Sequence, residues 1–190
     1  MVLEGRERET NVVVLGGGGI DTTACLHQLR MSGFNVRILH IDFGQVAASR
    51  EWAAVREIAS FFDVVASQVV VNASVNFGGG EIVGRNAFLL LLAVMYRHPE
   101  DELICIGVHA GTPFYDCSPA FFGEMSTLVA NLTSGRIRLI APLLHLQKSE
   151  VITYCREHQV PIELTYSCQT GEAIPCGVCF SCMDRKAMGC

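Results

Sequence analysis

Apolar runs alternate with segments of helical periodicity along this chain. Short runs rich in β-branched residues, such as "NVVVL" at 11–15, predict buried strands. Segments with apolar residues three or four positions apart, such as "SREWAAVREIASFF" at 49–62, predict helices, and glycine or proline marks several ends. The pattern predicts strands at 11–15, 35–41, 67–71, 102–108 and 136–142, and helices at 22–33, 49–62, 84–98, 120–135 and 148–159.

The predicted strands are continuous apolar runs, and each is followed by a helix. Strands of this kind are typical of a parallel sheet that helices cover on both faces. We therefore predict an α/β fold with a Rossmann-like, doubly wound parallel sheet of about five strands. The periodicity stops after Pro161, so we place the α/β domain at residues 1–163 and a cysteine-rich tail at residues 164–190.

Composition narrows the class of protein. The 190 residues fit one domain, and the formal net charge of -5 does not favour nucleic acid as a partner. The longest apolar stretch, "AFLLLLAVMY" at 87–96, is too short for a membrane span, which needs about 20 residues. The first ten residues, "MVLEGRERET", lack the apolar segment of a secretory signal. We expect a cytoplasmic protein with no membrane partner.

Four consecutive glycines, Gly16, Gly17, Gly18 and Gly19, follow the first predicted strand and form what we call the glycine loop. A loop at this end of a doubly wound sheet faces the ligand crevice. Without side chains, its backbone N–H groups can close around an anion, and the next helix directs its positive end to the same place. The spacing fits neither a dinucleotide fingerprint nor a Walker loop. The loop predicts phosphate binding, and the alternative is a tight turn with Asp21 as a helix cap.

Four of the nine cysteines, Cys168, Cys176, Cys179 and Cys182, have the spacing C-x7-C-x2-C-x2-C. Four thiolates complete the tetrahedral shell of a structural Zn²⁺, and Gly177 permits a tight turn between ligands. An iron–sulfur cluster or a set of free thiols is the alternative. Three further cysteines fall in predicted strands or helices and are expected in the core: Cys25, Cys105 and Cys155.

The segment "GGGIDT" at 17–22 resembles the S-G-G-x-D-[ST] loop of the PP-loop ATP pyrophosphatases, the adenine nucleotide alpha hydrolase-like group. Gly18, Gly19 and Asp21 match that pattern and Thr22 keeps its hydroxyl, whereas Gly17 stands where the group usually has serine. The resemblance implies binding of ATP with Mg²⁺, adenylation of a carboxylate or carbonyl, and release of pyrophosphate.

The tail "LTYSCQTGEAIPCGVCFSCMDRKA" at 164–187 is similar to the zinc tail of the 7-cyano-7-deazaguanine synthase (QueC) family, which reads L-T-[YW]-S-C and then C-G-x-C-x-S-C-x-x-R. Four further segments resemble the family in the expected order: "DFGQ" at 42–45, "GRNAFL" at 84–89, "YDCSPAFF" at 115–122 and "PLLHLQKSEV" at 142–151. Two segments depart from it. "VAASREW" replaces basic residues and a histidine, and the stretch at 69–86 is shorter than usual.

The resemblance implies a ligase that converts 7-carboxy-7-deazaguanine and ammonia to the nitrile at the expense of ATP, through an adenylated carboxylate and an amide. This chemistry depends on positioning and charge stabilisation, which suits a backbone anion site and a few cations better than a nucleophilic triad. It further implies a small deazapurine and ammonia as partners, and a homodimer.

Four residues are the candidates for catalysis. Asp21 suits Mg²⁺ or the pyrophosphate loop, and the resemblance places Lys148 near the ATP phosphates. Arg85 begins a predicted helix, where the dipole opposes a cation, so an anionic ligand would explain it. Asp116 suits Mg²⁺ or the amidine edge of the heterocycle. Helix caps for the two aspartates, a surface salt bridge for Arg85 and a solvated lysine are the alternatives.

The residues predicted to bind the nucleotide lie after the first two strands: Gly16, Gly17, Gly18, Gly19, Asp21, Thr22, Thr23, Asp42 and Gln45. Turn formation is the alternative for the last two. Asn86 could contact a purine-like edge or cap its helix. His109 and His145 each follow a strand and could do acid–base work, although a lone histidine is more often structural. Arg185 either reaches the crevice or pairs within the tail.

Two other functions stay open. One is a sister PP-loop enzyme that activates a protein-linked carboxylate, a related deazapurine or a tRNA base, which the change at Gly17 and the missing basic cluster favour. A sulfur-transferring enzyme should carry a cysteine pair at the crevice, but Cys117 there is single. The other is a non-catalytic nucleotide-binding module held together by zinc.

Overall fold

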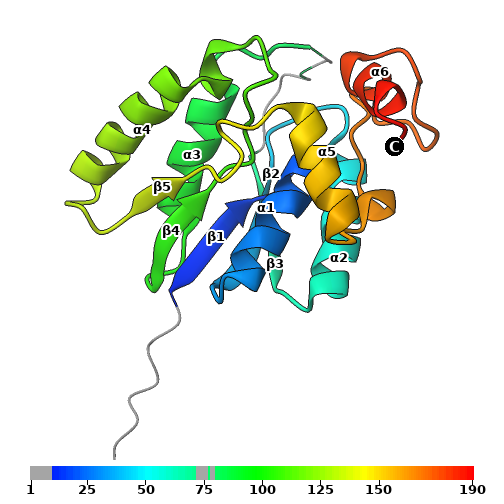
Figure 1. The fold of residues 1–190 in the computed structure, drawn as a ribbon. Helices are drawn as coiled ribbons and strands as arrows, with labels where there is room; N and C mark the ends of the chain where they lie inside the picture. The colour runs from blue at the N-terminus through cyan, green and yellow to red at the C-terminus, as the bar shows by residue number, and fades with distance from the viewer. Residues whose placement is uncertain (1–9, 72–76, 78–79) are drawn as a thin grey trace, which may run out of the picture.

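The computed structural model describes residues 10–71, 77 and 80–190 (Figure 1). Two predictions lie wholly or partly outside the described residues: the character of the N-terminal ten residues and the short connection before the third helix. Within the described ranges, no helix is long and apolar enough to cross a membrane.

Five parallel strands form one sheet in the order β3-β2-β1-β4-β5. The chain winds outward from β1 through β2 to β3, then returns to the other side of β1 for β4 and β5. The direction therefore reverses between β1 and β4, which makes their carboxyl ends the switch point where ligands bind in such sheets. The predicted parallel sheet is confirmed. Its strands are β1 (Asn11–Leu15), β2 (Asn35–Asp42), β3 (Ala66–Val70), β4 (Asp101–Cys105) and β5 (Arg138–Ile140).

Helices cover both faces of the sheet (Figure 1). Val12 and Val14 of β1 pack with α1, α2 and α5, whereas Val13 and Leu15 pack on the face covered by α3 and α4. Burial on both sides explains why the central strands read as continuous apolar runs. The main helices are α1 (Ile20–Met31), α2 (Ala48–Phe62), α3 (Arg85–Tyr96), α4 (Pro119–Leu132) and α5 (Lys148–Glu157).

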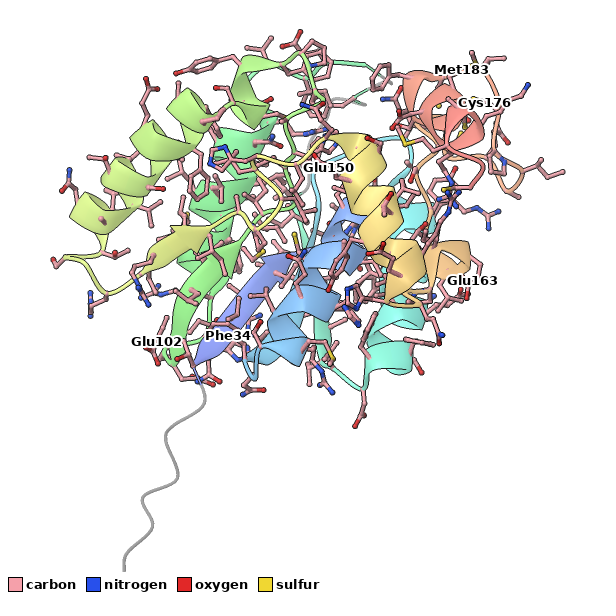
Figure 2. All side chains as sticks on the ribbon, in the orientation of Figure 1. Phe34, Glu102, Glu150, Glu163, Cys176 and Met183 are labelled. Carbon is pink, nitrogen blue, oxygen red and sulfur yellow. The ribbon has the colours of Figure 1, made fainter. Side chains whose placement is uncertain are left out.

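The predicted element ends differ from the observed ones by at most three residues. One helix was missed, α6 (Phe180–Ala187), which directly follows Cys179 and carries Cys182. Its cysteines set the local sequence pattern, and Phe180 and Met183 stay exposed, so no apolar period marks it. Single 3-10 turns occur at Tyr115–Cys117 and Ile162–Leu164. The tail gathers at one end of the molecule, where Figure 2 labels Cys176 and Met183.

Candidate functional site

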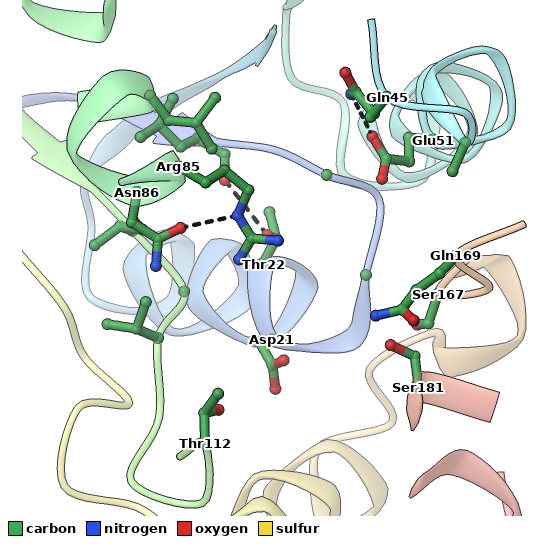
Figure 3. Close-up of a pocket in the computed structure, with 18 of the residues that line it drawn as sticks. Asp21, Thr22, Gln45, Glu51, Arg85, Asn86, Thr112, Ser167, Gln169 and Ser181 are labelled. Carbon is green, nitrogen blue, oxygen red and sulfur yellow. Dashed lines mark hydrogen bonds between the residues drawn. The ribbon is translucent and has the colours of Figure 1, made fainter. Parts of the chain in front are cut away.

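A cavity of about 360 Å³ lies at the carboxyl edge of the sheet, over the switch point between β1 and β4. The glycine loop, the first turns of α1, α3 and α5, and the tail contribute its wall. Figure 3 shows Asp21 and Thr112 on one side of this space, and Gln169 and Ser181 across from them. The topology thus brings segments from the whole chain to one place.

Packing fixes two of the glycines in the loop. A Cβ on Gly16 would come within 2.3 Å of Ile38 Cγ2, and one on Gly18 within 2.8 Å of the Glu51 carbonyl oxygen. Gly18 also has a φ of 69°, which side chains disfavour. A Cβ on Gly17 would meet nothing within 4 Å, and Gly17 lines the cavity while Gly18 does not. The exposed glycine backbone is therefore centred on Gly17.

The glycine loop is tied to the tail. The Tyr166 N–H donates to the Gly18 carbonyl oxygen at 2.8 Å, two residues before the first cysteine of the cluster. On the sheet side, His40 Nδ1 donates to the Gly16 carbonyl oxygen at 2.8 Å, and the His40 ring stacks on Trp52. His40 is fully buried and its Nε2 has no hydrogen-bond partner among the described residues. Sequence reasoning missed His40 because it sits in an otherwise apolar strand.

Asp21 points into the cavity from the first turn of α1 (Figure 3). Its Oδ1 accepts a hydrogen bond from Lys148 Nζ at 2.6 Å, and His109 Nε2 lies 3.9 Å from its Oδ2. Burial lowers the pKa of His109 below its ordinary value, which favours the neutral ring at neutral pH. Gly19 occupies the N-cap of α1, so the alternative role of Asp21 as a cap is wrong. The structure brings three predicted residues together here.

The two threonines of α1 face different ways. Thr22 lines the cavity, and its hydroxyl is 3.4 Å from the Leu15 carbonyl oxygen. Thr23 is fully buried, donates to the Gly19 carbonyl oxygen at 2.9 Å and does not line the cavity. The prediction that Thr23 contacts the nucleotide is therefore corrected, because its hydroxyl closes the first helical turn.

Asp42 and Gln45 flank the turn after β2, but only Gln45 lines the cavity. Asp42 Oδ1 accepts from the Gly44 N–H at 3.0 Å and does not line the cavity, so the turn-forming alternative holds for Asp42. Gln45 lines the cavity, and its Nε2 donates to Glu51 Oε2 at 2.7 Å. Burial raises the pKa of Glu51, which the hydrogen bond from Gln45 partly opposes. Sequence reasoning missed Glu51, although its place in the first turn of the helix after "DFGQ" was a usable signal.

Arg85 begins α3, and its guanidinium projects into the cavity toward Thr22 (Figure 3). Its Nε donates to Asn86 Oδ1 at 3.3 Å, and no carboxylate of the described residues lies within ion-pair distance. The salt-bridge alternative for Arg85 is therefore not supported. A cation at a helix N-terminus, beside the cavity and without an acidic partner, suits an anionic ligand.

Asp116 has a different role from the one its position suggested. Its Oδ2 accepts from the Asn86 backbone N–H at 3.2 Å, and Asn86 Nδ2 donates to the Asp116 carbonyl oxygen at 2.9 Å. Asp116 does not line the cavity, so its carboxylate holds the start of α3 rather than facing a ligand there. Its neighbour Cys117 does line the cavity, but burial and the Asp116 charge raise its pKa to about 11. Cys117 is therefore a thiol and not an activated nucleophile.

Arg185 and His145 are the last two candidates from the sequence. Arg185 lines the cavity, and its guanidinium donates to Thr165 Oγ1 at 2.7 Å and to the Ile162 carbonyl oxygen, which joins α6 to the turn before the cysteines. The alternative of a salt bridge within the tail is not supported, because its partners are neutral. His145 is exposed and lies outside the cavity wall, so only His109 of the two histidines faces the site.

The four clustered cysteines fit a metal ion. Their sulfur atoms all lie within 4.8 Å of one another, close to the roughly 3.8 Å between ligands that tetrahedral Zn–S bonds impose. The Cys176 N–H donates to Cys168 Sγ and the Cys179 N–H to Cys176 Sγ. Although burial opposes ionisation, hydrogen bonds from Cys176 and Thr170 lower the pKa of Cys168 to about 6, whereas burial raises the pKa of Cys182 to about 12. A closed set of four thiols at this spacing suits a structural zinc.

Comparison with solved structures identifies the fold. The fold resembles that of NMN synthetase from Francisella tularensis, with a TM-score of 0.58, 15% identity, and coverage of 95% of this chain and 77% of that chain. It also resembles a predicted subunit of tRNA methyltransferase from Methanocaldococcus jannaschii, with a TM-score of 0.55, 15% identity, and coverage of 78% and 74%. These likenesses are of fold: an α/β fold with one parallel sheet, which here carries the glycine loop at its switch point.

Sequence comparison gives the family. The profile of "Queuosine biosynthesis protein QueC" matches residues 11–83 and 80–188. A 7-cyano-7-deazaguanine synthase from Coxiella burnetii is 32% identical over 92% of this chain and 90% of the relative, and one from Koribacter versatilis is 30% identical over 91% and 86%. The chain therefore belongs to the QueC family of queuosine biosynthesis proteins.

Proposed function

We propose that this protein is an ATP-dependent ligase that converts 7-carboxy-7-deazaguanine and ammonia to 7-cyano-7-deazaguanine. The observation that carries the proposal is the convergence of the glycine loop, Asp21, Lys148 and Arg85 on one cavity. The activity of its relatives, which are named 7-cyano-7-deazaguanine synthases, suggests the substrate class. The chemistry divides the cavity into a phosphate end and an acceptor end.

The phosphate end lies at Gly17 and the first turn of α1. Backbone N–H groups and the helix dipole favour negative charge there, and Lys148 adds a cation 2.6 Å from the Asp21 carboxylate. Asp21 is the carboxylate that would hold Mg²⁺ beside the phosphates, where the ion supplies neutralising charge. Lys148, released from Asp21, then contacts the departing pyrophosphate.

The acceptor end lies at the start of α3. Arg85 lacks an acidic partner among the described residues and binds the carboxylate of the deazapurine, which is then adenylated. Ammonia displaces AMP to form the amide, and a second ATP activates the amide oxygen so that loss of AMP leaves the nitrile. Asp116 positions Arg85 by holding the N-terminus of α3. Gln45 and Glu51 offer donors and acceptors for a purine-like edge.

Three further properties belong to the proposal. The Zn²⁺ is structural because four cysteines leave no open coordination position for a substrate. By analogy with the family the protein acts as a homodimer, and we place it in the cytoplasm, where the nucleotide and the deazapurine are available.

The test is product analysis by mass spectrometry. Purified protein with the carboxylic acid, ATP, Mg²⁺ and ammonium should form the nitrile, and Arg85→Ala should lower the rate at least ~10-fold, about 1.4 kcal/mol of transition-state stabilisation. The matched control is Arg30→Ala, at an exposed position in the last turn of α1. A reaction that consumes ATP and stops at the amide would contradict the proposal.

One observation favours a second candidate, a sister enzyme with another acceptor. Val46 and Ala47 line the cavity, and both are apolar. An acceptor less charged than the carboxydeazaguanine would suit that wall better. Competition assays with related deazapurines and carboxylates, read as ATP-to-pyrophosphate exchange, distinguish the two candidates.

A further inference from the structure

The His109 ring is held in one tautomer by the backbone. The Gly111 N–H donates to His109 Nδ1 at 3.1 Å. A backbone N–H can only donate, so Nδ1 presents its lone pair and carries no hydrogen. The neutral ring therefore has its hydrogen on Nε2.

The Nε2–H group faces the cavity. It lies 3.9 Å from Asp21 Oδ2, which is beyond hydrogen-bond distance, and it has no other hydrogen-bond partner among the described residues. Asp21 and His109 both line the cavity, and the His109 side chain is only 12% exposed. A donor is thus directed at the space beside the first turn of α1.

Close backbone packing keeps the ring in this place. A Cβ on Gly107 would be 3.0 Å from the Thr22 backbone nitrogen, so the chain after β4 lies directly against the start of α1. A Cβ on Gly111 would be 3.2 Å from both Nδ1 and Cε1 of His109, so the loop packs tightly against the ring. These close contacts hold the His109 ring beside the cavity.

The charges around His109 leave the donor free for a ligand. Asp21 of α1, Lys148 of α5 and Asp184 of α6 are the charged groups that face the ring. Lys148 already donates to Asp21 Oδ1, while His109 approaches the other oxygen only to 3.9 Å. A neutral N–H beside a positive helix end adds an oriented donor without adding another charge to the site.

We propose that His109 Nε2–H donates a hydrogen bond to a phosphoryl oxygen of the bound nucleoside triphosphate, an assignment that rests on the proposed function. A fixed neutral donor stabilises the negative charge that develops as pyrophosphate leaves, and it does so without losing its own proton. This geometry does not suit a general base, because Nδ1 is engaged and Nε2 is already protonated. It replaces the acid–base role considered for His109 from the sequence.

A matched pair of variants separates the two ring nitrogens. The amide of His109→Asn reaches the place of Nδ1 and can accept from Gly111, but it leaves nothing at the place of Nε2. The amide of His109→Gln reaches the place of Nε2 and restores a donor there. Affinity for α,β-methylene ATP with Mg²⁺ should fall at least ~10-fold in His109→Asn and stay within about 3-fold of wild type in His109→Gln.

Nitrogen NMR of the histidine-labelled wild-type protein gives an independent reading. It should show the neutral Nε2–H tautomer for His109, and the Nε2–H signal should shift when α,β-methylene ATP is added. Hydrogen on Nδ1, or unchanged affinity in His109→Asn, would overturn the assignment. If wild type forms the nitrile but His109→Asn binds the analogue with unchanged affinity, only the assignment of His109 is wrong and the proposed function stands. If His109→Asn binds the analogue more weakly but wild type forms no nitrile, the proposed acceptor is wrong and the assignment of His109 to the nucleotide stands.

Discussion

Lys148 Nζ donates to Asp21 Oδ1 at 2.6 Å, across 127 positions of sequence. Lys148 is the first residue of α5, where the helix dipole opposes a cation, and Asp21 is in the first turn of α1, where an anion is favoured. The pair therefore offsets an unfavourable placement of the lysine. It also holds both groups at the wall of the cavity.

Asp21→Asn should lower turnover more than ATP affinity. The amide keeps the size of the side chain but removes the charge that a metal ion and Lys148 both require. We expect kcat for pyrophosphate release to fall at least ~10-fold and its dependence on Mg²⁺ to shift to higher concentration. Rates measured over a series of Mg²⁺ concentrations check this, and an unchanged Mg²⁺ dependence would show that another group holds the ion.

Gly17→Val should abolish nucleotide binding and leave the fold intact. The new side chain would start where nothing lies within 4 Å and would extend into the cavity, at the predicted phosphate position. Calorimetry should show no ATP binding, and thermal unfolding should stay near wild type. The control is Gly17→Ser, which adds a small hydroxyl and should bind ATP at least as well as wild type.

Gly18 is unsuitable for this purpose. A valine there would have to accept a φ of 69° and a contact of 2.8 Å with the Glu51 carbonyl oxygen. Gly18→Val should therefore destabilise the protein by ~2 kcal/mol or more. Chemical denaturation measures this loss, and a variant as stable as wild type would show that the loop adapts.

Removal of one cysteine ligand should release the metal. Cys179→Ser leaves three thiolates, so elemental analysis should fall from one zinc per chain to well below half. Cys190→Ser is the matched control, because Cys190 is exposed and lies outside the cluster. Less than half an equivalent of zinc in wild type, or a full complement of iron, would contradict the assignment of the metal.

Glu51→Gln should stabilise the protein at neutral pH. Burial raises the pKa of Glu51 above its ordinary value, so the unfolded chain ionises first and the charge costs stability as the pH rises through the folded pKa. The gain in melting temperature should be clear at about pH 7 and vanish near pH 4, below the unfolded pKa of ~4.3. The control is the exposed Glu57→Gln, which should show no such pH dependence.

The periodicity of the chain was sufficient to predict the sheet and the five main helices. Val12 to Leu15 are buried, and such a run between helical segments is typical of a parallel sheet that helices cover on both faces. The eight-residue helix α6 could not be predicted in this way. Its position is set by the cysteine cluster and by hydrogen bonds from Arg185, and neither leaves an apolar period.

The site was predictable by position along the chain but not by the direction of side chains. Consecutive helical residues point about 100° apart, so Thr22 faces the cavity while Thr23 faces the core. Asp116 was placed at the correct edge, yet its carboxylate turns to α3. Glu51 reaches the cavity only because α2 packs against Gly18, a contact between distant segments that local sequence does not encode.

The hydrogen bond from the Tyr166 N–H to the Gly18 carbonyl oxygen links the cysteine cluster to the glycine loop. Binding of zinc and binding of nucleotide should therefore be coupled, although the two ligands do not touch. The segment that leads into the cysteine cluster holds the glycine loop, so binding of the metal should order the loop where we propose that the nucleotide binds. Thermodynamic reciprocity then requires that bound nucleotide raises the equilibrium affinity for zinc by the same factor. At a limiting zinc concentration, the fraction of protein that holds the metal would then be higher with nucleotide than without it.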